Sequence, residues 1–292
     1  MFSCGGNEDI DLVQIFQTLE NNLNKTEKHL KKFVFFNQKM IELKENTFSD
    51  ITFDMIQIIN CHNLKTIHKN TFNTTDSLTT HISIEFNPKL TSPDNSIFEA
   101  LSKFVRLEQI ELGGNNITEI PSNAFQNKQD QLKFIQFFGK SFKKLGNNTF
   151  SQLKSLAQLF ITQTSIDFIP ENAFEFNEKS ENQMTINLGG NKYLNNSGLS
   201  ENSLTKLKRP TTLDVYSSTY SNFTFLEQKI FQPFFKSNDK NQIKLNDYSL
   251  DCSDCRNYWL KQNPTLLKQL TNSNCSNGKL LTDADSFENC SG

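Results

Sequence analysis

The sequence predicts a solenoid of the α/β type, in which about nine short parallel strands stack side by side. Three observations lead to this prediction. A phrase built on asparagine and phenylalanine recurs at intervals of 24 to 27 residues. A pair of apolar residues, separated by one residue, stands upstream of each copy. Both ends of the chain depart from the pattern. A unit that buries its apolar side only against its neighbours produces such a sequence.

The repeating unit is clearest near the middle of the chain. There, Leu107, Ile110, Leu112, Asn115 and Ile117 follow the pattern L-x-x-L-x-L-x-x-N-x-L of a leucine-rich repeat. The phenylalanine that ends each unit is expected to fill the convex side, where irregular turns replace a helix. The phrase occupies residues 46–48, 70–72, 123–125, 148–150 and 172–174, with a looser copy at 95–98.

Each strand should carry two inward-facing apolar residues, because successive side chains of a strand alternate between its two faces. The pattern places nine such pairs along the chain, and all eighteen positions are apolar. The pairs are Phe33/Phe35, Ile56/Ile58, Ile82/Ile84, Ile110/Leu112, Ile135/Phe137, Leu159/Ile161, Ile186/Leu188, Leu213/Val215 and Ile243/Leu245. This array predicts a horseshoe with its strands on the concave face.

A ladder position follows each pair by three residues, where the chain turns out of the strand. Asparagine suits this position, because its amide bonds to backbone groups that would otherwise be buried without a partner. The ladder residues are Asn87, Asn115 and Asn191, the small replacements Cys61, Thr164 and Ser218, and the less suitable Gln38 and Lys140. We expect local irregularity at the last two.

The open ends of a solenoid need caps. We therefore expect an N-terminal cap over residues 1–29, repeats over 30–247 and a C-terminal cap over 248–292. In the first cap, apolar residues at helical spacing predict an amphipathic helix over residues 7–24, with Asn7 as its N-cap. A helix that binds a partner is the alternative.

The second cap holds four of the six cysteines, which are Cys252, Cys255, Cys275 and Cys290. Two disulfides, a zinc site and a redox C-x-x-C pair are the possibilities. The disulfide hypothesis explains most, because the second tight C-x-x-C of a zinc knuckle is missing and the repeat excludes a thioredoxin-like unit. The spacing leaves three disulfide connectivities open. Cys4 has no assured partner.

The composition excludes several classes of protein. A net charge of −2 gives no strong attraction to nucleic acid or an anionic membrane, and no window approaches the ~18 apolar residues of a membrane span. The first ten residues lack the apolar core of a secretory leader, so either a leader has been removed or the chain is cytosolic. Together with a disulfide cap, Asn-x-Ser/Thr sequons favour a secreted glycoprotein. The candidate asparagines are Asn24, Asn73, Asn116, Asn147, Asn195 and Asn222.

The tail carries a recognisable likeness in three segments, LDCSDCRNYWL at 250–260, NCSNGKL at 274–280 and FENC at 287–290. It resembles the C-terminal cap of arthropod secreted leucine-rich repeat proteins similar to the oplophorus-luciferin 2-monooxygenase non-catalytic subunit. The resemblance implies an extracellular, non-enzymatic protein that binds partners. By analogy it also implies the pairs Cys252–Cys275 and Cys255–Cys290. The compact C-x-C of that family is C-x-x-C here.

Catalytic motifs are missing from the sequence. The four histidines form no spaced metal pair with carboxylates or cysteines, and no nucleophile elbow or H-E-x-x-H occurs. Glu85 and Glu111 are expected on adjacent strands, but no nucleophile accompanies them. We therefore expect no enzyme, no cofactor and no metal site.

The concave face is the candidate binding surface. Solvated strand positions should be polar, yet several here are large and apolar, with glutamine and glutamate between them. Exposed patches of this kind mark interaction sites. The candidate partner-binding residues are Phe36, Ile59, Glu85, Phe86, Glu111, Phe134, Phe138, Phe160 and Tyr216. The alternative is that the chain simply uses phenylalanine liberally and that a loop or glycan covers these rings.

Three functions remain open. The first is a secreted module that binds a protein or peptide through the concave face. The second is an accessory subunit of an extracellular complex that uses the convex side or a cap. The third is a cytosolic scaffold with reduced cysteines.

Overall fold

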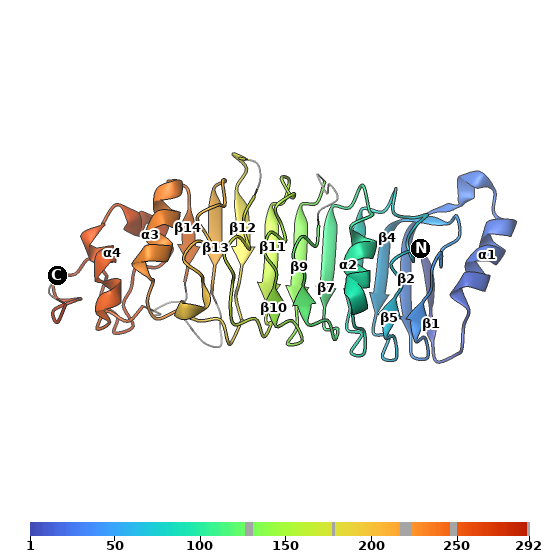
Figure 1. Ribbon diagram of the computed structural model, residues 1–292, viewed down its shortest axis with the longest axis horizontal. Helices are drawn as coiled ribbons and strands as arrows, with labels where there is room; N and C mark the ends of the chain where they lie inside the picture. The colour runs from blue at the N-terminus through green and yellow to red at the C-terminus, as the bar shows by residue number, and fades with distance from the viewer. Residues whose placement is uncertain (126–130, 177–178, 217–222, 246–249, 291–292) are drawn as a thin grey trace.

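The computed structural model describes residues 1–292 except 126–130, 177–178, 217–222, 246–249 and 291–292. Ten parallel strands form one sheet that runs the length of the molecule (Figure 1). Their order is β1 (Phe2–Gly6), β2 (His29–Asn37), β4 (Thr52–Ile59), β6 (His81–Glu85), β7 (Gln109–Gly113), β9 (Phe134–Phe138), β11 (Gln158–Thr162), β12 (Met184–Asn187), β13 (Thr211–Asp214) and β14 (Gln242–Lys244). This architecture is the predicted leucine-rich repeat solenoid.

The core lies between the sheet and the loops that connect successive strands. Seventeen of the eighteen predicted inward-facing residues are buried, and Val215 packs partly buried against the same core. The nine predicted strands are therefore confirmed in position and facing. The tenth strand, β1, was not predicted, and it pairs with β2 at the N-terminal edge.

The convex side combines irregular turns with short elements. Two-residue strands form the pairs β3 (Glu42–Leu43) with β5 (Thr66–Ile67) and β8 (Glu119–Ile120) with β10 (Lys144–Leu145). Helices α2 (Ser96–Leu101) and α3 (Gln228–Ser237) and the 3₁₀ turns η2 (Pro93–Asn95) and η3 (Asn196–Gly198) lie among the repeats. Toward the two ends, η1 (Lys25–Glu27) precedes β2, and η4 (Cys255–Asn257), α4 (Tyr258–Gln262) and η5 (Leu266–Gln269) follow β14.

The recurring phrase has a physical basis in these turns. Its phenylalanines stack from one repeat to the next, with ring centroids 5.8 Å apart for Phe48 and Phe72 and 6.2 Å apart for Phe125 and Phe150. Its asparagine adopts a left-handed backbone in four of the five close copies, and Asn95 does so in the looser copy. Asparagine and glycine tolerate that conformation best. In the close copies these residues are Asn46, Asn123, Asn148 and Asn172, with φ between 52° and 63°.

The asparagine ladder links neighbouring repeats. The Oδ1 atom of Asn87 accepts the N–H of Cys61 at 2.8 Å, and its Nδ2 donates to the carbonyl of Ile58 at 3.1 Å. In turn, the N–H of Asn87 donates to Oδ1 of Asn115 at 3.1 Å. Each ladder side chain thus satisfies backbone groups of the preceding repeat.

Irregularity at Gln38 takes the form of a one-residue shift in the ladder. Asn37 is buried and occupies the ladder position, and its N–H donates to the sulfur of Cys61 at 3.3 Å. Gln38 instead reaches the carbonyl of Asn60 at 2.9 Å. At Lys140, which is exposed, the ladder is interrupted, and it resumes where Oδ1 of Asn191 accepts the N–H of Thr164 at 2.8 Å.

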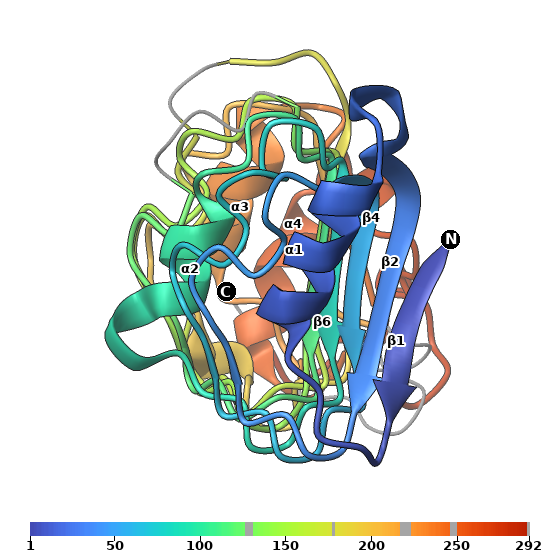
Figure 2. The same ribbon diagram turned by 90° about the vertical axis from the view of Figure 1, so that its right-hand side faces the viewer.

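The N-terminal cap differs from its prediction. Helix α1 spans Leu12–Asn22 rather than 7–24, and its N-cap is Asp11, whose carboxylate accepts the N–H of Gln14 at 3.1 Å. Asn7 is therefore not the cap. The preceding residues connect β1 to the helix, and the carbonyl of Glu8 accepts a hydrogen bond from Asn37 at 3.0 Å. In Figure 2, α1 lies over the end of the core and β1 forms the edge of the sheet.

The C-terminal cap is held by two disulfides, Cys252–Cys275 and Cys255–Cys290, with Cα atoms 5.5 Å and 5.3 Å apart. This is the alternating pairing implied by the resemblance. Trp259 closes the core, and its indole N–H donates to the carbonyl of Leu226 at 2.8 Å. Because all four cap cysteines are paired, no thiolate remains there for zinc or redox chemistry.

Candidate binding face

The outward side chains of the five central strands form three rows, which we call together the sheet face. The strand register defines them. The first row is Ile59, Glu85, Gly113, Phe138 and Thr162, the middle row is Gln57, Ser83, Glu111, Gln136 and Phe160, and the third row is Met55, His81, Gln109, Phe134 and Gln158. Seven of the nine predicted partner-binding residues therefore lie on or directly beside these rows; Phe36 and Tyr216 lie farther along the sheet.

The first aromatic pair rests on two glycines. The rings of Phe86 and Phe138 lie 5.5 Å apart and approach from strands on either side of β7. A Cβ atom on Gly113 would overlap the Phe138 ring, and one on Gly114 would lie 2.7 Å from Cδ1 of Phe86. The absence of these Cβ atoms therefore allows both rings to lie down across the end of β7.

Phe86 has an unusual backbone for an aromatic residue. Its φ is 56°, in the left-handed region, and its N–H donates to the carbonyl of Gly113 at 2.9 Å. At the equivalent position other repeats have Asn, Gly or Gln, and Asn and Gly adopt this conformation more readily than Phe does. Those residues are Asn60, Gly114, Gly139, Gln163 and Gly190. The pattern of apolar residues does not reveal this strain at Phe86, although the glycines at equivalent positions are a readable signal of it.

A second aromatic pair lies on the next strands. Phe134 and Phe160 meet edge to face, with ring centroids 5.4 Å apart. Both rings are half-buried. The two aromatic residues of β9 thus belong to two separate pairs, and Gln136 lies between them on the strand.

The remaining aromatic candidates stand apart from these pairs. Phe36 lies on β2, 42% exposed, and its ring covers Gly5 of β1. Tyr216 follows β13 and is 46% exposed. The structure therefore does not bring either residue into the two aromatic pairs.

Glu85 and Glu111 lie on adjacent strands of the sheet face, as predicted. Burial raises the pKa of Glu85, and the neighbouring Glu111 raises it further through its charge and through a hydrogen bond between the two carboxyl groups. Within the described ranges, no lysine, arginine or histidine forms an ion pair with either carboxyl.

The structure brings together no catalytic or metal-binding constellation in the part of the chain that it describes. No group of three or more His, Cys, Asp or Glu side chains is close enough to hold a metal ion there. His81 is engaged with its neighbour, since its Nδ1 atom lies 2.7 Å from the hydroxyl of Thr80. None of the described helices is long and apolar enough to cross a membrane.

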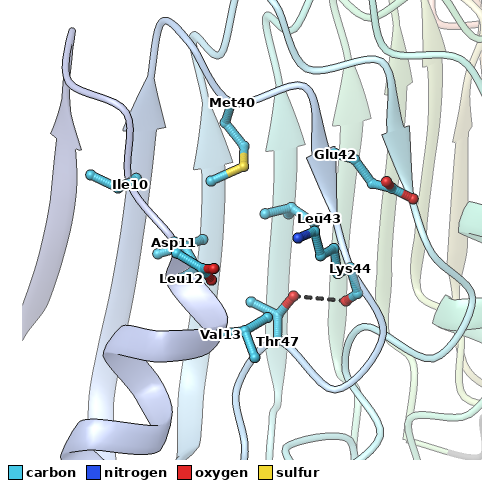
Figure 3. A pocket seen from close by; sticks show the side chains of 9 residues that line it. All are labelled: Ile10, Asp11, Leu12, Val13, Met40, Glu42, Leu43, Lys44 and Thr47. Carbon is cyan, nitrogen blue, oxygen red and sulfur yellow. Dashed lines mark hydrogen bonds between the residues drawn. The ribbon is translucent and has the colours of Figure 1, made fainter.

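A small pocket of about 120 Å³ lies between α1 and the first repeat (Figure 3). Two polar side chains that line it, Asp11 and Thr47, already form hydrogen bonds within the protein. Asp11 caps α1, and the hydroxyl of Thr47 donates to the carbonyl of Lys44 at 2.7 Å. We assign this pocket to the packing of the cap.

Five of the candidate glycosylation sites lie outside the strands. Five of the six predicted asparagines are exposed and none of the five belongs to a strand, namely Asn24, Asn73, Asn116, Asn147 and Asn195. Asn222 falls outside the described residues.

Comparisons with known proteins agree with this architecture. The profile of a BspA type leucine rich repeat region, with six copies, matches residues 1–130 and again residues 99–227. Over 300 aligned residues, the chain is 23% identical to the oplophorus-luciferin 2-monooxygenase non-catalytic subunit of Oplophorus gracilirostris. That alignment covers 95% of this chain and 78% of the relative.

Proposed function

Because this chain belongs to the BspA type leucine-rich repeat family, we propose that it is a secreted, non-catalytic protein that binds a protein or peptide through its sheet face. The proposed organisation is a cap over residues 1–29, repeats over 30–247 and a cap over 248–292. No cofactor takes part. The following observations support this function.

The pair Phe86–Phe138 carries the proposal. Two large rings lie on a solvent-facing surface, and one of them stands on a strained backbone. A left-handed conformation costs a bulky residue roughly 1–2 kcal/mol, and strain of this kind is concentrated at functional sites. Aromatic side chains anchor many protein interfaces. A binding role therefore accounts for a ring that the fold alone does not favour.

Secretion and glycosylation are part of the same proposal. Two disulfides persist in oxidising compartments, which favours an extracellular location and disfavours the cytosolic scaffold. The exposed sequon asparagines lie off the strands, so glycans at these sites would leave the sheet face open. Non-catalytic function is supported by the description of the relative as a non-catalytic subunit.

Affinity capture from the native extracellular fluid tests the proposal. The wild type is compared with Phe138→Asp and with the matched control Phe168→Asp, since Phe168 is 49% exposed and lies outside the strands. We expect a species that the wild type and the control retain and that Phe138→Asp loses, while thermal unfolding of all three stays similar. Equal retention by all three proteins would overturn binding through the sheet face.

An accessory role is the second candidate, and the similarity to a non-catalytic subunit favours it. In this case the chain would contact a larger complex through its convex side or a cap. A stoichiometric complex that survives Phe138→Asp would support this function. A strict monomer in native fluid would count against it.

A further inference from the structure

The sheet face has a charge pattern that specifies its partner more closely than the aromatic pairs do. Of the fifteen outward residues in its three rows, only Glu85, Glu111 and His81 are ionisable. Glu111 lies at its centre, Glu85 lies on the adjacent strand in the first row, and His81 is in the third row beside Thr80. The face is therefore acidic at Glu85 and Glu111, and among the described residues no lysine, arginine or histidine forms an ion pair with either carboxyl.

Aromatic rings border the acidic pair on the side of β9. Phe138 shares the first row with Glu85, and the register places Gly113 between them. Because Gly113 has no side chain, the ring of Phe138 extends over it toward Glu85. Ring faces attract cations, and an ammonium or guanidinium group between two carboxylates and a ring gains from both interactions.

Amide side chains surround this pair. In the middle row Gln136 lies beside Glu111, and Gln57 lies on the other side of it beyond Ser83; in the third row Gln109 and Gln158 flank Phe134. Each of these amides can donate and accept hydrogen bonds, as the backbone of an extended peptide requires. The rows therefore suit an extended peptide better than they suit a purely apolar ligand.

From charge complementarity, we propose that the sheet face binds a basic peptide segment, with one lysine or arginine side chain seated between Glu85 and Glu111 and an adjacent apolar residue against Phe86 and Phe138. This inference rests on the proposed function and names the chemistry of its ligand. The carboxylates provide selectivity for the cation, and the rings provide the apolar contact.

Selection from a random octapeptide library on the full disulfide-bonded chain tests the inference. The acid pair is neutralised in Glu85→Gln/Glu111→Gln. The matched control is Glu42→Gln/Glu119→Gln, which removes the same charge from exposed residues outside the ten-stranded sheet. We expect the wild type and control to enrich peptides that contain Lys or Arg beside an apolar residue. Neutralising the acid pair should weaken the selected peptides at least tenfold, and added salt should weaken them on the wild type.

The outcomes separate this inference from the function on which it rests. Peptides that depend on Phe138 but contain no excess of basic residues, or that bind the neutralised variant within twofold, overturn the inference and leave the sheet face as the binding surface. Peptides that tolerate Phe138→Asp overturn both. Failure to enrich any peptide that depends on the sheet face also overturns the inference.

Discussion

The substitution Phe86→Gly tests whether the ring of Phe86 serves partner binding or the stability of the fold. The substitution removes the left-handed strain at φ 56°, a gain of roughly 1–2 kcal/mol. Glycine offsets about 0.5–1 kcal/mol of that gain, because it loses more conformational entropy on folding than other residues do. Phe86 is 49% exposed, so its lost burial costs about 1 kcal/mol, and the lost ring pair with Phe138 costs about 0.5–1.5 kcal/mol. These opposing contributions leave a net loss of about 0–2.5 kcal/mol in the free energy of unfolding relative to the wild type.

Urea unfolding, followed by circular dichroism, measures this balance. Phe137→Ala is the reference, because Phe137 is fully buried on the other face of the same sheet and its truncation should cost about 3–5 kcal/mol. Partner retention is measured on the same samples, and we expect Phe86→Gly to lose it. A loss of more than about 3 kcal/mol in Phe86→Gly, as large as that of the buried reference, would show that the ring is a structural element, and the argument from strain would then be wrong.

Four further results are expected. Asn87→Ala leaves two buried backbone groups without partners and should cost about 2–5 kcal/mol in urea unfolding, whereas Asn182→Ala, an exposed control, should change little. Burial raises the pKa of Cys61 to about 11, so maleimide should label it at neutral pH only after unfolding. The raised pKa of Glu85 makes its stabilising contribution fade as pH rises through that pKa; Glu85→Gln should therefore be the more stable protein at neutral pH, and the difference should vanish below pH 4.5. Arg209→Met should cost about 3 kcal/mol by calorimetry, because the buried guanidinium donates to the carbonyls of residues 154 and 156 at 2.8 Å each; an unchanged midpoint would contradict this role.

The strands and the direction in which their side chains point could be predicted, because every repeat needs the same inward-facing pair of apolar residues. Where one repeat fits the pattern poorly, its alignment can be set by the neighbouring repeats. The register of Phe137, for example, follows from Ile135 and from the pairs on either side. The outward residues follow from the same alternation. This is why the candidate residues of the central strands fall on one face.

Features that depend on a single repeat could not be predicted in the same way. Strand β1 lies outside the repeats, and its five residues contain two glycines, which are depleted in strands. The shift of the ladder from Gln38 to Asn37 depends on the first repeat meeting a cap rather than another repeat. The strain at Phe86 requires a comparison of backbone angles, which a pattern of apolar residues does not contain.

Gly113 and Gly114 give this surface a property that its contact residues lack. Neither glycine offers a side chain to a partner, yet the two together determine where the rings of Phe86 and Phe138 come to rest. A methyl group at either position would lift a ring and reshape the surface without altering any residue that touches the ligand. Substitutions at Gly113 or Gly114 can therefore change which ligands the surface selects. An alanine scan of the exposed aromatic and charged residues would not include these two positions.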